Sequence, residues 1–188
     1  MDKKSLKIWS VLVIIAIVVT IVFPLNHWLT LTMLRHQLIE IPVLLFTGVI
    51  FGKIIWKPDA KNVSFSVSLI IFFMFSLIFW MLPKSIDLAV LNPLFNKLMN
   101  IHIFIAGICA FSIIKDSVFE LKVYFTGMIS AMLMAVGITL RVFNLLLCSS
   151  FSIEQQRETG IYLITIAIIM FIYTTFILMS NIINPEKN

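Results

Sequence analysis

Six long apolar segments constrain this chain more than any other feature of its sequence. Each is close to the roughly 20 residues that a helix needs to cross the ~30 Å hydrocarbon core of a bilayer. Backbone N–H and C=O groups in lipid must be satisfied within the segment, so we expect helices. The sequence therefore predicts an all-α, polytopic membrane helical bundle of about six transmembrane helices. These segments lie at about residues 8–24, 29–52, 64–82, 98–114, 122–147 and 160–183.

The composition excludes a water-soluble domain of this size. Of the 188 residues, 61% are hydrophobic and only 12% are charged, whereas a soluble fold needs a charged exterior. The sequence shows no polar insertion, linker or low-complexity tract between the apolar segments. We therefore expect residues 1–188 to form a single integral membrane domain, with the lipid bilayer as its first partner.

The basic residues predict the orientation of the helices. If six helices alternate, most lysines fall on one side of the membrane, and the positive-inside rule places that side and both termini in the cytoplasm. Only Lys84, Lys97 and Arg157 fall on the opposite side. Scattered loop lysines form no phosphate-binding stripe, so we expect a multi-pass protein of the cell membrane with no nucleic-acid partner. The inner lysines are Lys3, Lys4, Lys7, Lys53, Lys57, Lys61, Lys115, Lys122 and Lys187.

The outer ends of the predicted helices carry aromatic and turn signals. Trp28 and Trp80 fall at outer ends, where we expect them to lie in the membrane interface. The longest outer connection runs from about residue 83 to 97. Its apolar residues after Ser85 predict a short helix on the membrane surface, which Pro93 would interrupt.

Four ionisable side chains share the outer half of the bilayer or its midplane. At 1.5 Å per residue, His36 lies about 10 Å below the outer boundary, Glu40 about 16 Å, His102 about 6 Å and Arg141 about 9 Å. Ionisable groups at such depths are costly and are functional-site candidates by default. Their similar depth on three helices predicts a common polar site.

The sequence repeats a Met-x-x-His pattern at this depth. Met33 precedes His36, and Met99 precedes His102, by three residues. Residues i and i+3 share a helix face, so each helix can offer a thioether and an imidazole in one direction. Thioethers suit Cu(I), and imidazoles suit copper, zinc or iron. We therefore predict a copper site with these four residues as ligands, to which Met81 and Cys148 could add soft ligands.

The remaining polar residues have more than one interpretation. Glu40 and Asp87 would orient the ligating imidazoles through hydrogen bonds, as carboxylates often do around metals. Alternatively, Glu40 bonds His36 at i, i+4 without a metal, Arg141 neutralises Glu40 structurally, and Asp87 is only a loop cap. The sequence leaves these alternatives open.

Two stretches resemble the CtaG-type membrane proteins that assist assembly of cytochrome c oxidase. They run from Thr32 to Gly48 and from Trp80 through Leu94 to His102 and Gly107, together about a quarter of the chain. The residues that match the family pattern are Trp80, Pro83, Asp87 and His102, with Met33 and His36 in the first stretch. The family has a second histidine where this chain has Thr32. The resemblance implies copper delivery or handling at the outer membrane face.

Our leading functional prediction is a copper-handling membrane protein tied to assembly or operation of a copper-containing membrane oxidase. One alternative is an accessory structural subunit of a larger membrane complex. Another is a b-type haem protein with His36 and His102 as axial ligands. A proton-coupled carrier that uses Glu40 and Arg141 is a further alternative. The sequence has no P-loop, dinucleotide-binding, HExxH or CxxC motif, and no reaction is predicted.

Overall fold

The computed structural model describes residues 3–55, 63–143 and 147–183, with side chains from Trp9 onward. These residues fold into helices joined by short turns, and no strand occurs among them. Five helical segments are long and apolar enough to cross a membrane, and Trp9–Val22 is a shorter apolar helix. The chain is therefore a multi-pass, all-α membrane bundle, as predicted. In order, its helices are α1 (Lys3–Val22), α2 (Asn26–Thr30), α3 (Met33–Arg35), the π-turn η1 (His36–Glu40), α4 (Ile41–Ile55), α5 (Val63–Met81), α6 (Pro83–Leu91), α7 (Pro93–Asp116), α8 (Phe119–Val142) and α9 (Ile153–Ile183).

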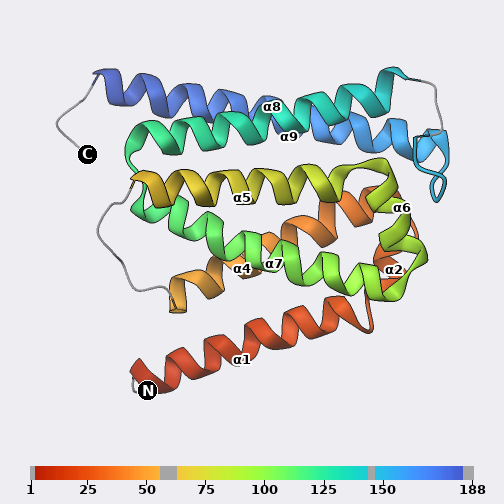
Figure 1. Cartoon of the computed structure of the whole chain (residues 1–188), viewed down its shortest axis with the longest axis horizontal. Coiled ribbons are helices and arrows are strands. Elements are labelled where there is room, and N and C mark those ends of the chain that lie inside the picture. The colour runs from red at the N-terminus through yellow and green to blue at the C-terminus, as the bar shows by residue number, and fades with distance from the viewer. Residues whose placement is uncertain (1–2, 56–62, 144–146, 184–188) are drawn as a thin grey trace.

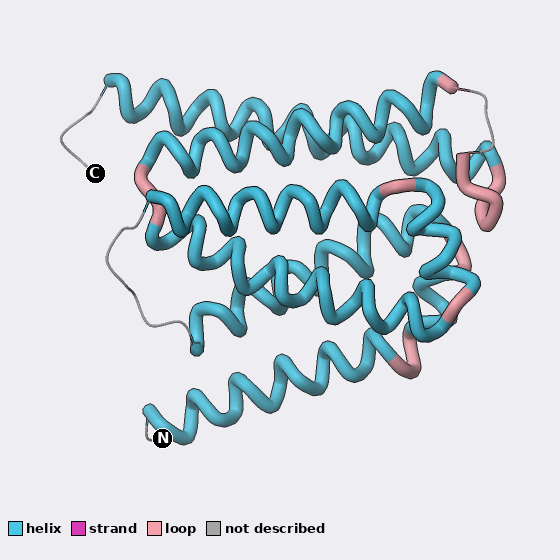
Figure 2. The backbone as a smooth tube through the Cα atoms, in the orientation of Figure 1, coloured by secondary structure: helices cyan, strands magenta, loops and turns pink. Residues whose placement is uncertain are grey.

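The long helices run side by side in an up-and-down order (Figure 1; Figure 2). α1 lies at one edge of the bundle, the α8–α9 hairpin at the other, and α4, α5 and α7 between them. α1 begins and α9 ends at the same end of the bundle, while the short helices α2 and α6 lie at the opposite end. This arrangement fits an even number of crossings with both termini on one side. That this side is cytoplasmic stays a prediction. Of the lysines behind it, Lys57, Lys61 and Lys187, and the side chains of Lys3, Lys4 and Lys7, lie outside the described residues.

Glycines set the closest helix contacts. A Cβ atom added to Gly48 of α4 would overlap the carbonyl oxygen of Phe104, and one added to Gly107 of α7 would overlap that of Leu45. The two backbones can approach this closely only because neither residue has a side chain. α8 and α9 meet in a similar way, since a Cβ on Gly160 would lie 2.7 Å from the carbonyl oxygen of Gly137.

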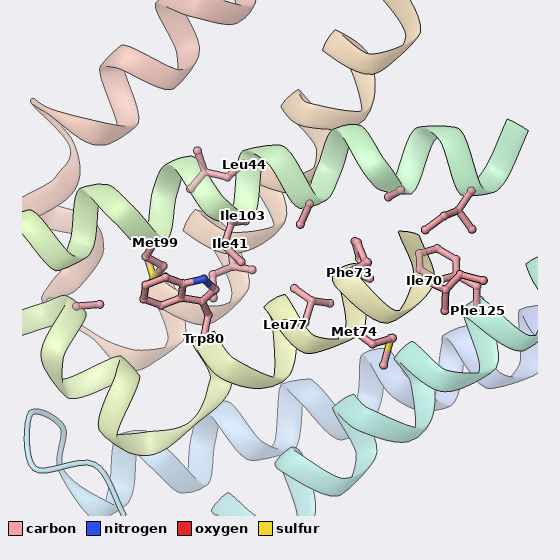
Figure 3. Packing of buried hydrophobic residues seen from close by; sticks show 14 of the residues in the cluster. Ile41, Leu44, Ile70, Phe73, Met74, Leu77, Trp80, Met99, Ile103 and Phe125 are labelled. Carbon is pink, nitrogen blue, oxygen red and sulfur yellow. The ribbon is translucent and has the colours of Figure 1, made fainter. Parts of the chain in front are cut away.

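A buried apolar cluster joins α4, α5 and α7 (Figure 3). Leu44 of α4, Leu77 of α5 and Ile103 of α7 are among its members. Trp80 belongs to this core and is only 4% exposed. Trp80 lies at a helix end, as predicted, but its ring packs against Phe95 and His102 of α7 and does not face outward. That it lies at the depth of the membrane interface stays a prediction.

A π-turn interrupts the second membrane-spanning segment between α3 and α4. The backbone N–H of Ile41 bonds the carbonyl oxygen of His36, five residues back. Pro42 follows directly and has no N–H to donate, so the wider turn lies where the regular helical ladder would be broken anyway. Single π-turns of this kind occur frequently at functional sites.

The outer connection between α5 and α7 differs in part from the prediction. α6 is the expected short helix, but Pro93 does not interrupt it. Pro93 instead occupies the first position of α7, where its missing N–H costs nothing. The Asn92 side chain caps α7 by accepting hydrogen bonds from the backbone N–H groups of Leu94 and Phe95. α7 therefore begins five residues before the predicted position 98.

Candidate functional site

His36 and Glu40 form a buried pair on the π-turn. His36 Nδ1 and Glu40 Oε2 share a hydrogen bond of 2.6 Å, and both side chains are completely buried. This is the i, i+4 hydrogen bond that the sequence left open as one alternative; that Glu40 orients a metal-ligating imidazole stays a prediction. His36 Nε2 and Glu40 Oε1 have no hydrogen-bond partner. The pair thus keeps one donor or acceptor atom free on each side chain.

His102 is held by α5 through both ring nitrogens. The indole Nε1 of Trp80 donates to His102 Nδ1 at 2.8 Å, and the Ser76 hydroxyl lies 3.2 Å from His102 Nε2. Ser76 donates its own proton to the carbonyl oxygen of Phe72, so it accepts from an Nε2–H. This network assigns the neutral Nε2–H tautomer to His102. Neither nitrogen is free for a metal while these contacts hold.

The two predicted Met-x-x-His pairs lie in different parts of the core. Met33 and Met99 are both completely buried. Met33 packs in a cluster with Met81 and Cys148, whereas Met99 belongs to the α4–α5–α7 cluster. Among the described residues, no group of three or more His, Cys, Asp or Glu side chains could hold a metal ion. Met33 and Met99 therefore belong to separate clusters of the core.

Asp87 organises the loop before α9. Its carboxylate accepts hydrogen bonds from the backbone N–H groups of Ser149 and Ser150, at 2.8 and 2.9 Å, and from the Ser149 hydroxyl. Burial alone would raise the pKa of Asp87, but these hydrogen bonds outweigh it and hold the pKa below its usual value. These contacts are those of the loop-cap alternative, and within the described parts of the chain no hydrogen bond joins Asp87 to an imidazole.

Arg141 does not lie where the sequence predicted it. α8 ends at Val142, not near residue 147, so Arg141 is in its last turn and is exposed. In the described part of the chain, the buried Glu40 has its ion pair with His36, and none joins it to Arg141. The predicted depth and the neutralisation of Glu40 by Arg141 are therefore wrong. The helix end was predicted too late because the residues that follow α8 in the sequence are also apolar.

A cavity lined by sulfur-bearing side chains lies beside the π-turn. It encloses about 260 Å³, and Met33, Met81, Met132 and Cys148 line it together with Gln37. These residues come from α3, α5, α8, the loop before α9 and η1. The rest of the lining is almost wholly apolar. Soft donors from distant segments of the chain are thus gathered around one space.

Cys148 is fixed in this cavity by Gln156 and by the loop that Asp87 caps. The Gln156 amide donates to the Cys148 carbonyl oxygen at 3.0 Å and accepts from the Cys148 N–H at 3.4 Å. Burial, together with the negative charge of Asp87, raises the pKa of the Cys148 thiol to about 12. The thiol is therefore protonated near neutral pH, and a bound cation would have to displace its proton.

Several of these site residues were not found from the sequence. Gln37 was overlooked although it is an amide next to His36 inside an apolar run. Ser76 lies four residues before Trp80, a spacing that places both on one helix face and could have suggested a shared partner. Met132 carries no such signal, because one methionine in an apolar helix is usually packing.

Comparisons of the chain with protein-family models, with curated proteins and with solved structures found no match. The site is therefore interpreted from its own geometry.

Proposed function

We propose that this protein handles Cu(I) as cargo in the membrane, in connection with the assembly or operation of a copper-containing membrane oxidase. The observation that carries the proposal is the cavity lined by Met33, Met81, Met132 and Cys148. Three thioethers and one thiol from four separate segments form a donor set that is selective for a soft cation. No carboxylate or imidazole is among the described residues that line this cavity.

The surroundings of the cavity favour holding a metal ion and releasing it again. Thioethers are neutral ligands, so a cation in this cavity keeps its charge unless Cys148 loses its proton. Binding through the thiolate is then linked to proton release, which makes the affinity depend on pH. Gln156 holds the backbone of Cys148, and Asp87 holds the backbone of the two residues that follow it, so the sulfur stays in place.

This proposal changes the predicted ligand set. Met33 stays a ligand. The Nε2 atom of His36 has no partner, but His36 does not line the cavity and would add a donor only if its imidazole moved. Use of His102 would require loss of its hydrogen bonds with Trp80 and Ser76. The same cost applies to a b-type haem with His36 and His102 as axial ligands, so the geometry favours copper over haem.

The proposed link to an oxidase rests on the family resemblance alone. The matching residues Trp80, Pro83, Asp87 and His102 lie on the continuous segment formed by α5, α6 and α7. Asp87 on this segment holds the loop that carries Cys148, which gives the matching residues a structural connection to the proposed cavity.

Cu(I) titration of the purified protein in lipid nanodiscs, against a chromogenic Cu(I) chelator, tests the proposal. We expect binding of one equivalent, and at least tenfold weaker binding in Met33→Leu, Met132→Leu and Cys148→Ala. Met128→Leu and Cys109→Ala are matched controls outside the cavity and should bind as the unchanged protein does. Equal affinity in all six proteins would refute a site in this cavity.

If no Cu(I) binds and other subunits copurify, the accessory-subunit alternative is favoured. A Soret band in the protein purified from its native membrane, lost in His36→Ala, would favour the haem alternative.

A further inference from the structure

A second and larger cavity lies between α4 and the α8–α9 hairpin. It encloses about 440 Å³, within the range of small-molecule pockets. Its walls include Pro42 and Leu45 of α4, Leu77 of α5, Ile129 of α8 and Leu163 of α9. α8 and α9 pack against each other far more closely than either packs against α4, so this space separates the hairpin from the rest of the bundle.

The side chain of Gln37 lines this cavity and lacks hydrogen-bond partners. It is 2% exposed, and neither its Nε2 nor its Oε1 atom has a partner. A buried amide without partners destabilises the fold relative to one that is satisfied, and there is little water in a bilayer to satisfy it. A bound group that both accepts and donates a hydrogen bond would remove this cost.

The other end of the cavity reaches the lipid-facing surface. Among its lining residues, Phe46 of α4 is 68% exposed, Ile114 of α7 is 52% exposed and Ile166 of α9 is 38% exposed. All three belong to membrane-spanning segments. A molecule dissolved in the bilayer could therefore enter from the side without crossing a polar surface.

The lining excludes a charged head group. None of the residues that line this cavity is charged, and the only polar ones are Gln37 and Thr126. Thr126 uses its hydroxyl to donate to carbonyl oxygens of its own helix, at 3.1 Å. Among the lining residues, Gln37 thus offers the only free hydrogen-bond donor, while the Thr126 hydroxyl can still accept, and the rest of the ligand must be apolar.

We propose that this cavity binds a membrane-soluble molecule with an apolar chain and an uncharged head that carries a carbonyl or hydroxyl group. An isoprenoid quinone or quinol and a diacylglycerol both have this chemistry. The head lies against the Gln37 amide and the chain extends toward Phe46 and Ile166. Gln37 and Met81 line both this cavity and the sulfur-lined one, but the inference does not depend on copper, because its evidence is the unpaired Gln37 amide and the apolar walls.

Binding of three probes to the protein in nanodiscs tests the inference, with native mass spectrometry as the readout. The probes are decylubiquinone, dioleoylglycerol and, as a charged comparison, oleate at pH 8. We expect one equivalent of at least one uncharged probe and no stoichiometric binding of oleate. The preferred uncharged probe distinguishes the two sources of the ligand.

Two variants locate the bound molecule. Gln37→Leu removes the polar contact and should weaken binding about tenfold, the effect of one lost hydrogen bond. Ile166→Trp fills the lipid-facing end and should also abolish binding without altering Gln37. Gln155→Leu and Ile169→Trp are the matched controls, since neither residue lines the cavity, and they should bind normally.

The inference is overturned if no uncharged probe binds, or if both test variants bind as well as their controls. If no probe binds and Gln37→Leu raises the thermal stability, Gln37 is a buried polar residue without a ligand, and the inference is also overturned.

Discussion

The indole Nε1 of Trp80 donates a hydrogen bond of 2.8 Å to Nδ1 of His102. The contact joins the C-terminal end of α5 to α7 inside the apolar core. It also decides which tautomer His102 adopts, since Ser76 accepts from the other ring nitrogen. A histidine that the sequence marked as a metal ligand therefore acts in this structure as a connection between two helices.

Trp80→Phe should destabilise the protein by about 1–3 kcal/mol, because it leaves Nδ1 of the half-buried His102 without its donor while an aromatic ring is kept. The midpoint of thermal unfolding in detergent measures the change. Trp9→Phe is the control, since Trp9 is 60% exposed. Equal midpoints for the two variants would show that the hydrogen bond contributes nothing to stability.

Gly107→Ala should destabilise the bundle by about 1–3 kcal/mol, the usual range for overpacking, because the new methyl group meets the carbonyl oxygen of Leu45. Gly127→Ala is the matched control in α8. The nearest atom to its new methyl group is Thr174 Cγ2 at 4.0 Å, an ordinary contact. Unfolding of both variants under the same conditions checks the difference. A Gly107→Ala protein as stable as Gly127→Ala would contradict the close contact of α4 with α7.

Low pH should loosen the loop that carries Cys148. The pKa of Asp87 is lowered in the folded protein, so its contribution to stability is fully present above the ordinary aspartate pKa of about 4. The contribution is lost as the pH falls through the lower, folded-state pKa. Thermal unfolding between pH 7 and pH 3 should therefore show a decline that Asp87→Asn lacks, with the variant less stable at pH 7. Glu158→Gln, at an exposed position, should keep this pH-dependent decline. If the decline is absent in Glu158→Gln, it does not come from Asp87 alone.

The sequence predicted the fold because length and hydropathy decide membrane-spanning helices almost alone. It also offered the bond between His36 and Glu40 as one alternative, since this bond depends only on local helical spacing. It could not predict that Trp80 lies in the core, because that depends on how α6 and α7 pack over the end of α5. The rotation of each helix was equally undetermined, so Met33 and Met99 were predicted at one site although they belong to separate clusters.

The cavity residues show the same limit. Gln37, Met81, Met132 and Cys148 lie on different segments, and only the tertiary structure brings them together. The end of α8 was misplaced for a different reason. Phe143 and Leu147 are apolar, and hydropathy does not distinguish an apolar loop at the membrane surface from the continuation of a helix.

The buried pair of His36 and Glu40 predicts a strongly non-additive pair of mutations. Glu40→Leu leaves Nδ1 of a completely buried imidazole unpaired, and an unsatisfied buried polar group costs about 1–3 kcal/mol. His36→Leu leaves the Glu40 carboxyl group unpaired at a similar cost. The double variant removes both polar groups from the apolar interior, so it should be more stable than either single variant. A double-mutant cycle on the free energy of unfolding in bicelles measures this coupling. Additive effects would mean that each side chain has another partner, such as a water molecule on His36 Nε2 or Glu40 Oε1.

Cu(I) titration of the double variant adds a functional readout. Unchanged affinity would assign the pair to the structure of the π-turn, and weakened affinity would add His36 to the sulfur ligands.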